Sequence, residues 1–265
     1  MKKVVDGLVL RGSPVGENDR LLTVLTAKDG KMLMNAKGAR SMKSKVMPLC
    51  RQYTYANIEY YEKGDRKWLS GGSVNDSFFG LSADIEGLSL AAYICDVADE
   101  ITGEGVDASD VLRMTLNALY LIDKKQKPYW QIKSVYELFA VCVSGMEPDM
   151  SVCGRCHKSP QGEYWLDVMN GRIICEECMR RSGVGSLPIE VDEYATRNIF
   201  LPLDASALEA ARYVLSSDIS RAFAFELRTE SSIEMLTRAS ESYLLNHLER
   251  NFDTLDFLKS VTDGK

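Results

Sequence analysis

The chain has 265 residues, of which 45% are hydrophobic and 26% are charged, a composition typical of a globular protein with room for two domains and a small insert. No apolar run approaches the roughly 18 residues that a membrane-spanning helix needs. Lys2 and Lys3 are followed closely by Asp6, which argues against a secretory signal peptide. These features exclude an integral membrane protein and favour a protein of the reducing cytoplasm.

The formal net charge of -6 is distributed unevenly along the chain. Residues 1–67 contain fourteen Lys and Arg and seven Asp and Glu, a net charge of +7, whereas the remaining residues carry -13. The total charge argues against nucleic acid as a partner, because phosphate is repelled by an acidic surface. The asymmetry instead predicts different partners for the two parts, with any attraction for phosphate confined to the first.

The first 80 residues predict a small β domain. Turn residues such as Asp29-Gly30 and Gly64-Asp65 separate short apolar runs, and such runs are typical of strands joined by hairpins. Strands are expected at residues 4–11, 20–27, 31–37, 52–62 and 67–74. In the third of them, Met32, Met34 and Ala36 alternate with residues of the opposite face. Five short strands in about 75 residues predict a five-stranded OB-fold barrel.

A basic segment lies between the third and fourth expected strands. Residues 37–45 carry four positive side chains and no acidic one, and Gly38 and the serines favour a flexible loop. Such a run is ordinarily a solvated loop, and its functional interpretation is phosphate binding. The tyrosines that follow could offer stacking faces to bases, although alternation places some of them in the core. These tyrosines are Tyr53, Tyr55, Tyr60 and Tyr61.

From Leu81 onward the spacing of apolar residues becomes helical. Segments 82–102, 109–123 and 130–146 each carry apolar residues three and four positions apart, so each predicts an amphipathic helix with a buried stripe. In the first segment, that stripe is Ile85, Leu88, Ala92, Cys95, Ala98 and Ile101. Further helices are expected at about 192–200, 204–216 and 229–249, with a short one near 218–226.

Four cysteines form two closely spaced pairs between the two helical parts. Cys153 and Cys156 are separated by two residues, as are Cys175 and Cys178. This spacing predicts one structural zinc ion per chain, because zinc takes four thiolates in a tetrahedron at about 2.3 Å. Four protein ligands also leave no position for a catalytic water molecule.

The same cysteines could instead be four unrelated thiols, a pair of disulfides or the ligands of a catalytic zinc. The odd total of seven cysteines and a reducing compartment argue against disulfides. His157 could replace one ligand, or it could lie beside the site or on the surface. The basic residues of the module could offset the thiolate charge or contact phosphate, although a solvated basic rim is the simpler interpretation. They are Arg155, Arg172, Arg180 and Arg181.

No catalytic motif is present in the sequence. It lacks a Walker A motif, a G-x-S-x-G motif, an H-E-x-x-H motif and the zinc-deaminase pattern. The carboxylates are spread along helix faces without a recognisable acid/base pair. We therefore predict a protein that is not an enzyme. The alternative is a zinc-containing enzyme that processes nucleic acid, or an accessory subunit of one.

Three runs of residues resemble the bacterial RecO family of DNA repair and recombination mediators. They are residues 8–26, residues 30–40, and residues 242–248 with 255–260. The family combines an N-terminal OB domain, a helical domain and often a zinc insert, which agrees with the elements expected above. Residues 249–253 are more acidic here than the corresponding part of the family tail. Any contact made by that tail is therefore the least transferable part of the resemblance.

The resemblance implies a cytoplasmic mediator that associates with the bacterial nucleoid when it is bound to DNA. RecO proteins bind single- and double-stranded DNA and anneal complementary strands. With RecR, they help to load RecA onto single strands coated by single-strand binding protein (SSB), whose C-terminal tail docks on the helical domain. A basic rim for that tail could come from Arg113, Lys124, Lys125 and Lys127.

We accordingly expect an α+β protein in which an all-α domain carries an inserted four-cysteine module. The expected divisions are an OB domain over 1–80, helices over 81–150, the zinc module over 151–182 and further helices over 183–265. The DNA backbone is expected to follow the basic residues of the barrel, because phosphate contacts are independent of sequence. These residues are Lys31, Lys37, Arg40, Lys43, Lys45 and Arg51.

Overall fold

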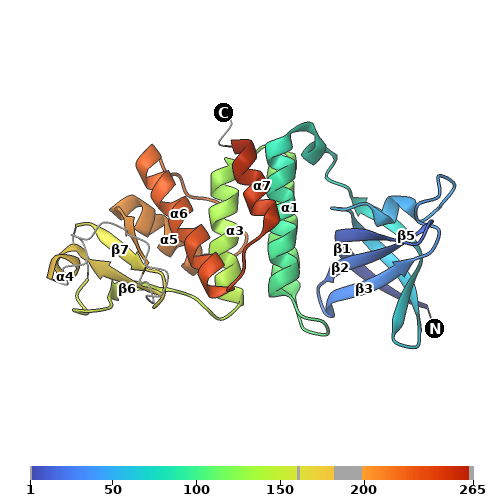
Figure 1. The fold of residues 1–265 in the computed structure, drawn as a ribbon, viewed down its shortest axis with the longest axis horizontal. Coiled ribbons are helices and arrows are strands. Elements are labelled where there is room, and N and C mark those ends of the chain that lie inside the picture. Colours follow the sequence, from blue (N-terminus) through green and yellow to red (C-terminus); the bar gives the residue numbers. More distant parts are fainter. Residues whose placement is uncertain (1, 160–161, 182–198, 263–265) are drawn as a thin grey trace. The chain divides into compact units, whose positions relative to one another are not determined.

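The computed structural model describes residues 2–159, 162–181 and 199–262. They form two compact units, one from Met1–Tyr129 with Phe252–Lys265 and the other from Trp130–Asn251. The division follows packing and not chain order, since the C-terminal segment packs with the first unit. Figure 1 shows the barrel of the first unit and the helices and small sheet of the second.

The N-terminal strands form a closed barrel, which confirms the predicted OB-type fold. Its neighbours run in the order β1-β2-β3-β5-β4, with β4 also paired to β1. The β3–β5 pair is parallel and the other pairs are antiparallel. The strands are β1 (Lys2–Val15), β2 (Asp19–Thr26), β3 (Gly30–Ala36), β4 (Tyr55–Lys63) and β5 (Arg66–Asp76).

The barrel interior is filled by apolar side chains from every strand. Met32, Met34 and Ala36 of β3 are buried, whereas Leu33 between them is exposed. The predicted alternation is therefore confirmed, because successive side chains of a strand point to opposite faces. The other strands contribute Val9, Leu22, Val24, Ile58 and Leu69 to the same core cluster.

A short 3-10 turn and three helices follow the barrel strands in the first unit. They are η2 (Phe79–Ala83), α1 (Ile85–Ile101), α2 (Ser109–Asp123) and α7 (Asp253–Thr262). Helix α1 contacts α2, α7 and η2. The helices expected at 82–102 and 109–123 are thus confirmed to within a few residues.

The stripe expected on α1 is wrong at its N-terminal end. Ile85 and Leu88 are 58% and 38% exposed, while Leu90, Tyr93 and Ile94 are buried. Apolar residues occur on several sides of this helix, so spacing alone does not select one face. The packing of α2 and α7 against α1 selects the buried set.

The second unit combines three long helices with a four-stranded sheet in the order β6-β8-β7-β9. The helices are α3 (Tyr129–Val143), α5 (Ala205–Ser216) and α6 (Glu230–His247), with a short α4 (Glu176–Arg181). The strands are β6 (Asp149–Cys153), β7 (Tyr164–Asp167), β8 (Arg172–Cys175) and β9 (Phe200–Leu203). Because β9 pairs with β7, the sheet of the cysteine module includes a strand from well beyond it.

The short helix expected near 218–226 is not found, and the helix expected at 192–200 lies largely outside the described residues. Most of residues 192–200 lie outside the described residues, and Phe200 begins a strand. The short helix near 218–226 is wrong, since residues 219–223 form turns and residues 224–229 are irregular. Asp218 accepts hydrogen bonds from the amide and hydroxyl of Ser220 at 2.8 and 2.6 Å, which favours a turn over a helix.

A buried ion pair connects α3 and α6 within the second unit. Lys133 Nζ lies 2.7 Å from Glu137 Oε1 and 2.8 Å from Glu241 Oε2, and Ser240 Oγ donates to Glu137 Oε2 at 2.7 Å. Burial raises the pKa of Glu137, against the lowering effect of Lys133.

None of the described helices combines the length and the apolar character that crossing a membrane requires.

Candidate metal centre and nucleic-acid interface

The four paired cysteines converge on one point of the second unit. Cys153 ends β6, Cys175 ends β8, Cys178 lies in α4 and Cys156 lies in the turn after β6. Their four sulfur atoms all lie within 4.8 Å of one another. This geometry agrees with the prediction that the four cysteines converge on one site, and the cluster could hold a metal ion.

The chain reaches this geometry through a tight turn after β6. The amide of His157 donates to the carbonyl of Cys153 at 2.8 Å, and His157 adopts a φ of +58°. The amide of Gly154 donates to the carbonyl of Ile173 at 2.8 Å. A Cβ atom on Gly154 would lie 2.1 Å from Cδ of Arg172, so any larger residue here would have to displace the Arg172 side chain.

Hydrogen bonds from the backbone favour the ionised form of one thiol. Burial raises the pKa of Cys153, but the amides of Cys156, Cys175 and Arg155 outweigh burial and lower that pKa to about 6. Burial raises the pKa of Cys178 to about 12, with the neighbouring cysteines adding to the effect. A divalent metal ion would deprotonate all four thiols, since the thiolate is the form that coordinates.

The donor set fits zinc. Four thiolates at 2.3 Å in a tetrahedron place their sulfurs about 3.8 Å apart, and Cys156 Sγ lies 3.8 Å from Cys175 Sγ. Soft sulfur donors without oxygen ligands favour zinc over magnesium or calcium. His157 is exposed and contributes no atom to the cluster. A hollow of about 480 Å³ beside Cys156 and Cys175 leaves the site accessible from solvent.

The arginines of the module are largely engaged within it. Arg155 Nη1 donates to the carbonyl of Cys178 at 3.3 Å. Arg180 and Arg181 each form an ion pair with a glutamate one turn earlier in α4, and the side chain of Arg172 lies against Gly154. Arg155 thus has a structural contact, whereas Arg180 and Arg181 remain exposed and their surface ion pairs are weak.

The end of α6 contacts the cysteine module through an aromatic pair. Tyr243 and His247 have ring centroids 4.1 Å apart. Tyr243 Oη donates to the carbonyl of Met146 at 3.0 Å, and His247 Nε2 lies 2.8 Å from the carbonyl of Val168. Residues 242–248 carry part of the family resemblance, and the structure assigns them this contact, which no local sequence pattern predicts.

The basic loop of the barrel is partly anchored and not freely flexible. The amide of Gly38 donates to Asp19 Oδ1 at 2.7 Å, and the amide of Arg40 donates to the carbonyl of Asn18 at 2.9 Å. Arg40 Nη1 also donates to the carbonyls of residues 16 and 17 at 3.3 and 3.0 Å. Ala39 is buried. The turn between β1 and β2 therefore holds this loop in place.

Four of the six expected DNA-binding residues lie on one loop of the barrel, and Lys31 lies apart from them. Lys31 points to α1, where its Nζ lies 3.0 Å from Asp99 Oδ1 and 2.7 Å from the Asp99 carbonyl oxygen. Among the described residues, no ion pair neutralises the other lysines or Arg51. Lys37, Arg40, Lys43 and Lys45 lie on the one loop, and Arg51 is exposed just after η1 (Met47–Cys50).

The tyrosines after the loop separate into different environments. Tyr60 belongs to the barrel core, Tyr53 and Tyr55 are half-buried, and Tyr61 is 43% exposed. Burial raises the pKa of Tyr53. Of these four tyrosines, Tyr61 is therefore the most exposed.

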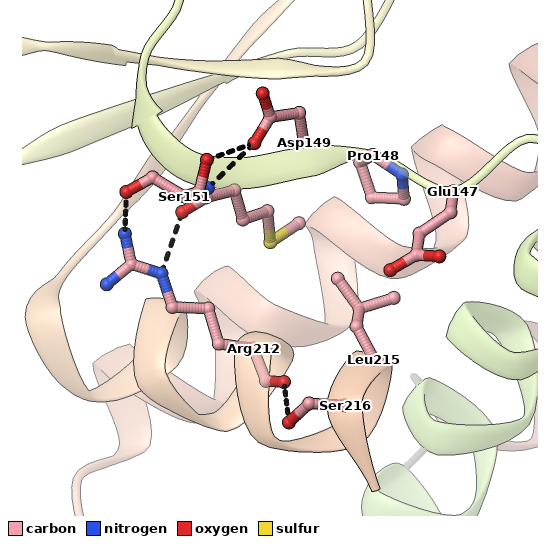
Figure 2. Close-up of a pocket in the computed structure, with 8 residues that line it drawn as sticks. Glu147, Pro148, Asp149, Ser151, Arg212, Leu215 and Ser216 are labelled. Atoms are coloured by element: carbon pink, nitrogen blue, oxygen red, sulfur yellow. Dashed lines mark hydrogen bonds between the residues drawn. The ribbon is translucent and has the colours of Figure 1, made fainter. Parts of the chain in front are cut away.

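A cavity of about 520 Å³ lies in the second unit beside β6 and α5. Figure 2 shows the guanidinium of Arg212 turned toward the strand, with Leu215 and Pro148 on the opposite side. Arg212 donates to the carbonyls of residues 150 and 151 at 2.7 and 3.1 Å, and Asp149 accepts from the amide of Ser151 at 2.9 Å. These polar groups are occupied by the chain itself, so the cavity is best described as a junction between strand and helix.

An OB-type barrel with an exposed basic loop, followed by helices that carry a four-cysteine module, defines a class of nucleic-acid-associated protein. Family models agree with this. One described as Recombination protein O N terminal matches residues 1–78, and one described as Recombination protein O C terminal matches residues 82–256. The chain belongs to the RecO family of DNA repair proteins, as its sequence resemblance indicates.

Several curated relatives match nearly the whole chain. The DNA repair protein RecO of Acetivibrio thermocellus is 28% identical over 255 residues, which cover 96% of this chain and 95% of the relative. The RecO protein of Alkaliphilus metalliredigens is 24% identical over 257 residues, covering 97% and 98%. That of a Thermoanaerobacter species is 23% identical over 257 residues, covering 97% and 96%.

Proposed function

We propose that this RecO-family protein is a non-enzymatic recombination mediator that binds single- and double-stranded DNA and anneals complementary strands. With RecR, it would help to load RecA onto SSB-coated single strands in the bacterial cytoplasm, at the nucleoid. The observation that carries the DNA-binding part is the exposed loop of residues 37–45, which holds four cations on an otherwise acidic protein. Family membership supports the rest.

The mechanism of binding is neutralisation of phosphate charge. Lys37, Lys43 and Lys45 have no acidic partner among the described residues. Each phosphate that they contact releases condensed counterions, which supplies affinity without sequence preference. Arg40 serves mainly to orient the loop, since its guanidinium is bonded to backbone carbonyls. Lys31 contributes least, because an aspartate on α1 offsets its charge.

Annealing follows from the same contacts. Two complementary strands repel each other through their phosphates, and a cationic loop that neutralises part of that charge lowers the repulsion. A protein that contacts phosphate and not base edges leaves the edges free to pair. This role needs no bond breaking, which agrees with the lack of a catalytic motif in the sequence.

We also propose one zinc ion per chain, held by Cys153, Cys156, Cys175 and Cys178. Such an ion would cross-link the ends of β6 and β8 to α4. With four thiolate ligands it would have no open position for substrate, so its role would be structural.

Docking of the SSB tail near α2 has weaker support than DNA binding at the loop. Lys124 Nζ lies 2.6 Å from Asp123 Oδ2, and Lys125 Nζ lies 3.5 Å from Asp84 Oδ2. Acidic neighbours therefore reduce the positive potential that an acidic tail would need. If a tail peptide binds undiminished after all four basic residues are changed to alanine, its site lies elsewhere. Those four are Arg113, Lys124, Lys125 and Lys127.

The DNA proposal is tested by changing Lys37, Lys43 and Lys45 together to alanine. Affinity for single and double strands should fall for every sequence. The slope of log affinity against log salt on single strands should flatten by about 2 units, because each lost phosphate contact removes about 0.7. Annealing should fall in parallel. Lys28→Ala is the matched control, since Lys28 is an exposed lysine of the same barrel that pairs with Asp107.

An unchanged slope in a folded triple variant would place the DNA site off this loop.

The same samples should be incubated with labelled DNA and Mg²⁺ or Mn²⁺. Strand cleavage there would favour a nucleic-acid-processing enzyme over a mediator.

A further inference from the structure

One row of outward-facing side chains crosses four adjacent strands of the barrel. Tyr61 of β4 lies directly opposite Trp68 of β5, Trp68 is in register with Asn35 of β3, and Tyr61 is in register with Lys2 of β1. The chain neighbours of the aromatic pair, residues 60 and 69, belong to the core. Since side chains alternate along a strand, Tyr61 and Trp68 face outward.

This outer face is unusually apolar for a surface in contact with water. Each of the four adjacent strands contributes an apolar or aromatic side chain to it: Leu33, Trp68, Tyr61 and Val4. Leu33 is 44%, Tyr61 43% and Val4 58% exposed, and Trp68 is half-buried. Outward positions of an antiparallel sheet are normally polar, and apolar side chains gathered on a surface commonly mark a binding site.

Positive charge surrounds this apolar strip. Lys63 and Arg66 are paired at the tip of the β4–β5 hairpin, one outward position beyond the aromatic pair. Lys37 directly follows β3, and Lys2 lies in register with the tyrosine. On the same face, Glu59 pairs with Lys2 at 2.6 Å. Cations therefore outnumber acids here, although the whole chain has a net charge of -6. Figure 1 shows this hairpin extending from the barrel.

The partner of such a face must be anionic and must present flat apolar surfaces. A single-stranded nucleic acid meets both requirements, because its phosphates are charged and its bases are unstacked. Aromatic rings within a positive groove bind single strands without sequence preference. A duplex does not meet the second requirement, since its bases already stack on one another.

We propose that the outer face formed by Leu33, Trp68, Tyr61 and Val4 is a stacking platform for the bases of single-stranded nucleic acid. Tyr61 and Trp68 would each stack on a base, and the cations around them would contact the flanking phosphates. This inference rests on the DNA binding proposed above and assigns it a second component. The loop of residues 37–45 holds phosphates of either form, whereas the platform acts only on single strands.

The test is the affinity of Tyr61→Leu for oligo(dT) and for a duplex of the same length, measured by fluorescence anisotropy at several salt concentrations. Leucine keeps the apolar contact of Tyr61 and removes the aromatic face. We expect affinity for oligo(dT) to fall roughly 5- to 140-fold, the range for the loss of one base stack. Duplex affinity should change by less than about twofold, because duplex bases do not reach the ring. The salt slope should stay the same, because no charge is removed.

A second measurement uses Trp68 itself. Oligo(dT) should quench part of the tryptophan emission of the unmodified protein, and Trp68→Phe should abolish that quenching. The other two tryptophans, Trp130 and Trp165, belong to the second unit. Tyr120→Ala is the matched control for the loss of an exposed ring, because Tyr120 is also 43% exposed and lies on α2.

The outcomes separate this inference from the proposed function. If no nucleic acid binds to the unmodified protein, the proposed function fails. If DNA binds with a steep salt slope while Tyr61→Leu matches the unmodified protein on oligo(dT), the platform is overturned and the phosphate-binding loop stands. An equal loss on oligo(dT) and duplex would also overturn the platform, as would full quenching in Trp68→Phe.

Discussion

Asp84 is a single carboxylate that connects three parts of the first unit. Its Oδ1 accepts from the amide of Glu86 at 3.1 Å and caps α1, while its Oδ2 accepts from Tyr129 Oη at 2.8 Å. Lys125 Nζ lies 3.5 Å from the same Oδ2. The Tyr129 hydrogen bond, more than the Glu86 amide and Lys125, lowers the pKa of Asp84 below its ordinary value of 3.8, against the opposing effect of burial.

Asp84→Ala should destabilise the protein by about 1 kcal/mol at neutral pH, which is typical for the loss of a helix N-cap. Because the folded-state pKa is lowered, the stabilisation from the ionised form is present above pH 3.8 and is lost as the pH falls through the lowered value. The difference in unfolding free energy between variant and parent should therefore shrink below about pH 4. Urea titrations between about pH 7 and pH 3 measure this difference.

Asp84→Asn is the control for this prediction. Asparagine retains the capping acceptor but carries no charge. This variant should therefore lose the pH-dependent part of the stabilisation that Asp84 provides and keep most of the pH-independent part. A parent–alanine difference that stays constant across the whole titration would contradict the stabilising role of ionised Asp84.

Among the elements of the second unit, those of the cysteine module should depend most on a metal ion. Cys153, Cys156, Cys175 and Cys178 bring the ends of β6 and β8 together with α4. Binding energy at structural zinc sites is folding energy, of order 10 kcal/mol in isolated finger peptides. Loss of the proposed zinc should therefore loosen these elements first and leave the first unit folded.

Cys175→Ser should lower the zinc content well below one ion per chain, as measured by elemental analysis of purified protein. Amides of β8 and α4 should lose protection from hydrogen exchange, because the variant lacks one of the four ligands that hold them together. Amides of α1 in the first unit should keep their protection from hydrogen exchange, since that helix packs on α2 and α7.

Cys142→Ser is the matched control, because Cys142 is a half-buried free cysteine of α3 that lies outside the cluster. It should retain the full metal content. Retention of one zinc per chain by Cys175→Ser would rule out the proposed ligand set.

The chain as a whole ends by returning to the unit in which it began. Helix α7 packs on α1, and Phe252 meets Tyr93 edge to face with ring centroids 5.6 Å apart. Thr254 Oγ1 donates to Asp96 Oδ2 at 2.9 Å, and the next residue, Leu255, is buried. Phe252 and helix α7 therefore stabilise the first unit, although the whole second unit separates them from it in sequence.

Phe252→Ala should destabilise the first unit by about 3 kcal/mol or more, the usual cost of removing a buried phenylalanine side chain. Hydrogen exchange of α1 should quicken, and α6 in the second unit should be unaffected. Phe257→Ala in α7 is the control, since Phe257 is 53% exposed, and it should change stability by less than about 0.5 kcal/mol. Equal effects of the two substitutions would contradict the packing of this segment on α1.

Local signals in the sequence are sufficient for much of this protein. They predict the barrel strands, the helices at 82–102 and 109–123, and the meeting of four cysteines, because each depends on residues close together in the chain. Alternation indicates which side of a strand is buried, and paired C-x-x-C spacing indicates a shared metal site. The helix expected at 218–226 is wrong, because the local Asp218–Ser220 turn is joined there by a contact that no local pattern shows. Gln131, far away in sequence, donates to the carbonyls of Phe223 and Phe225.

The OB-type barrel and the basic loop of residues 37–45 follow from the sequence alone, since periodicity, turn residues and charge are properties of short segments. The family follows from the resemblance of three runs of residues, which is also a property of the sequence. Which basic residues remain available depends on the folded arrangement. Lys31 is separated from Asp99 by 68 positions in sequence, yet the two side chains form an ion pair. The placement of Trp68 opposite Tyr61 on the outer face also emerges only in three dimensions, because strand register depends on the pairing of whole strands.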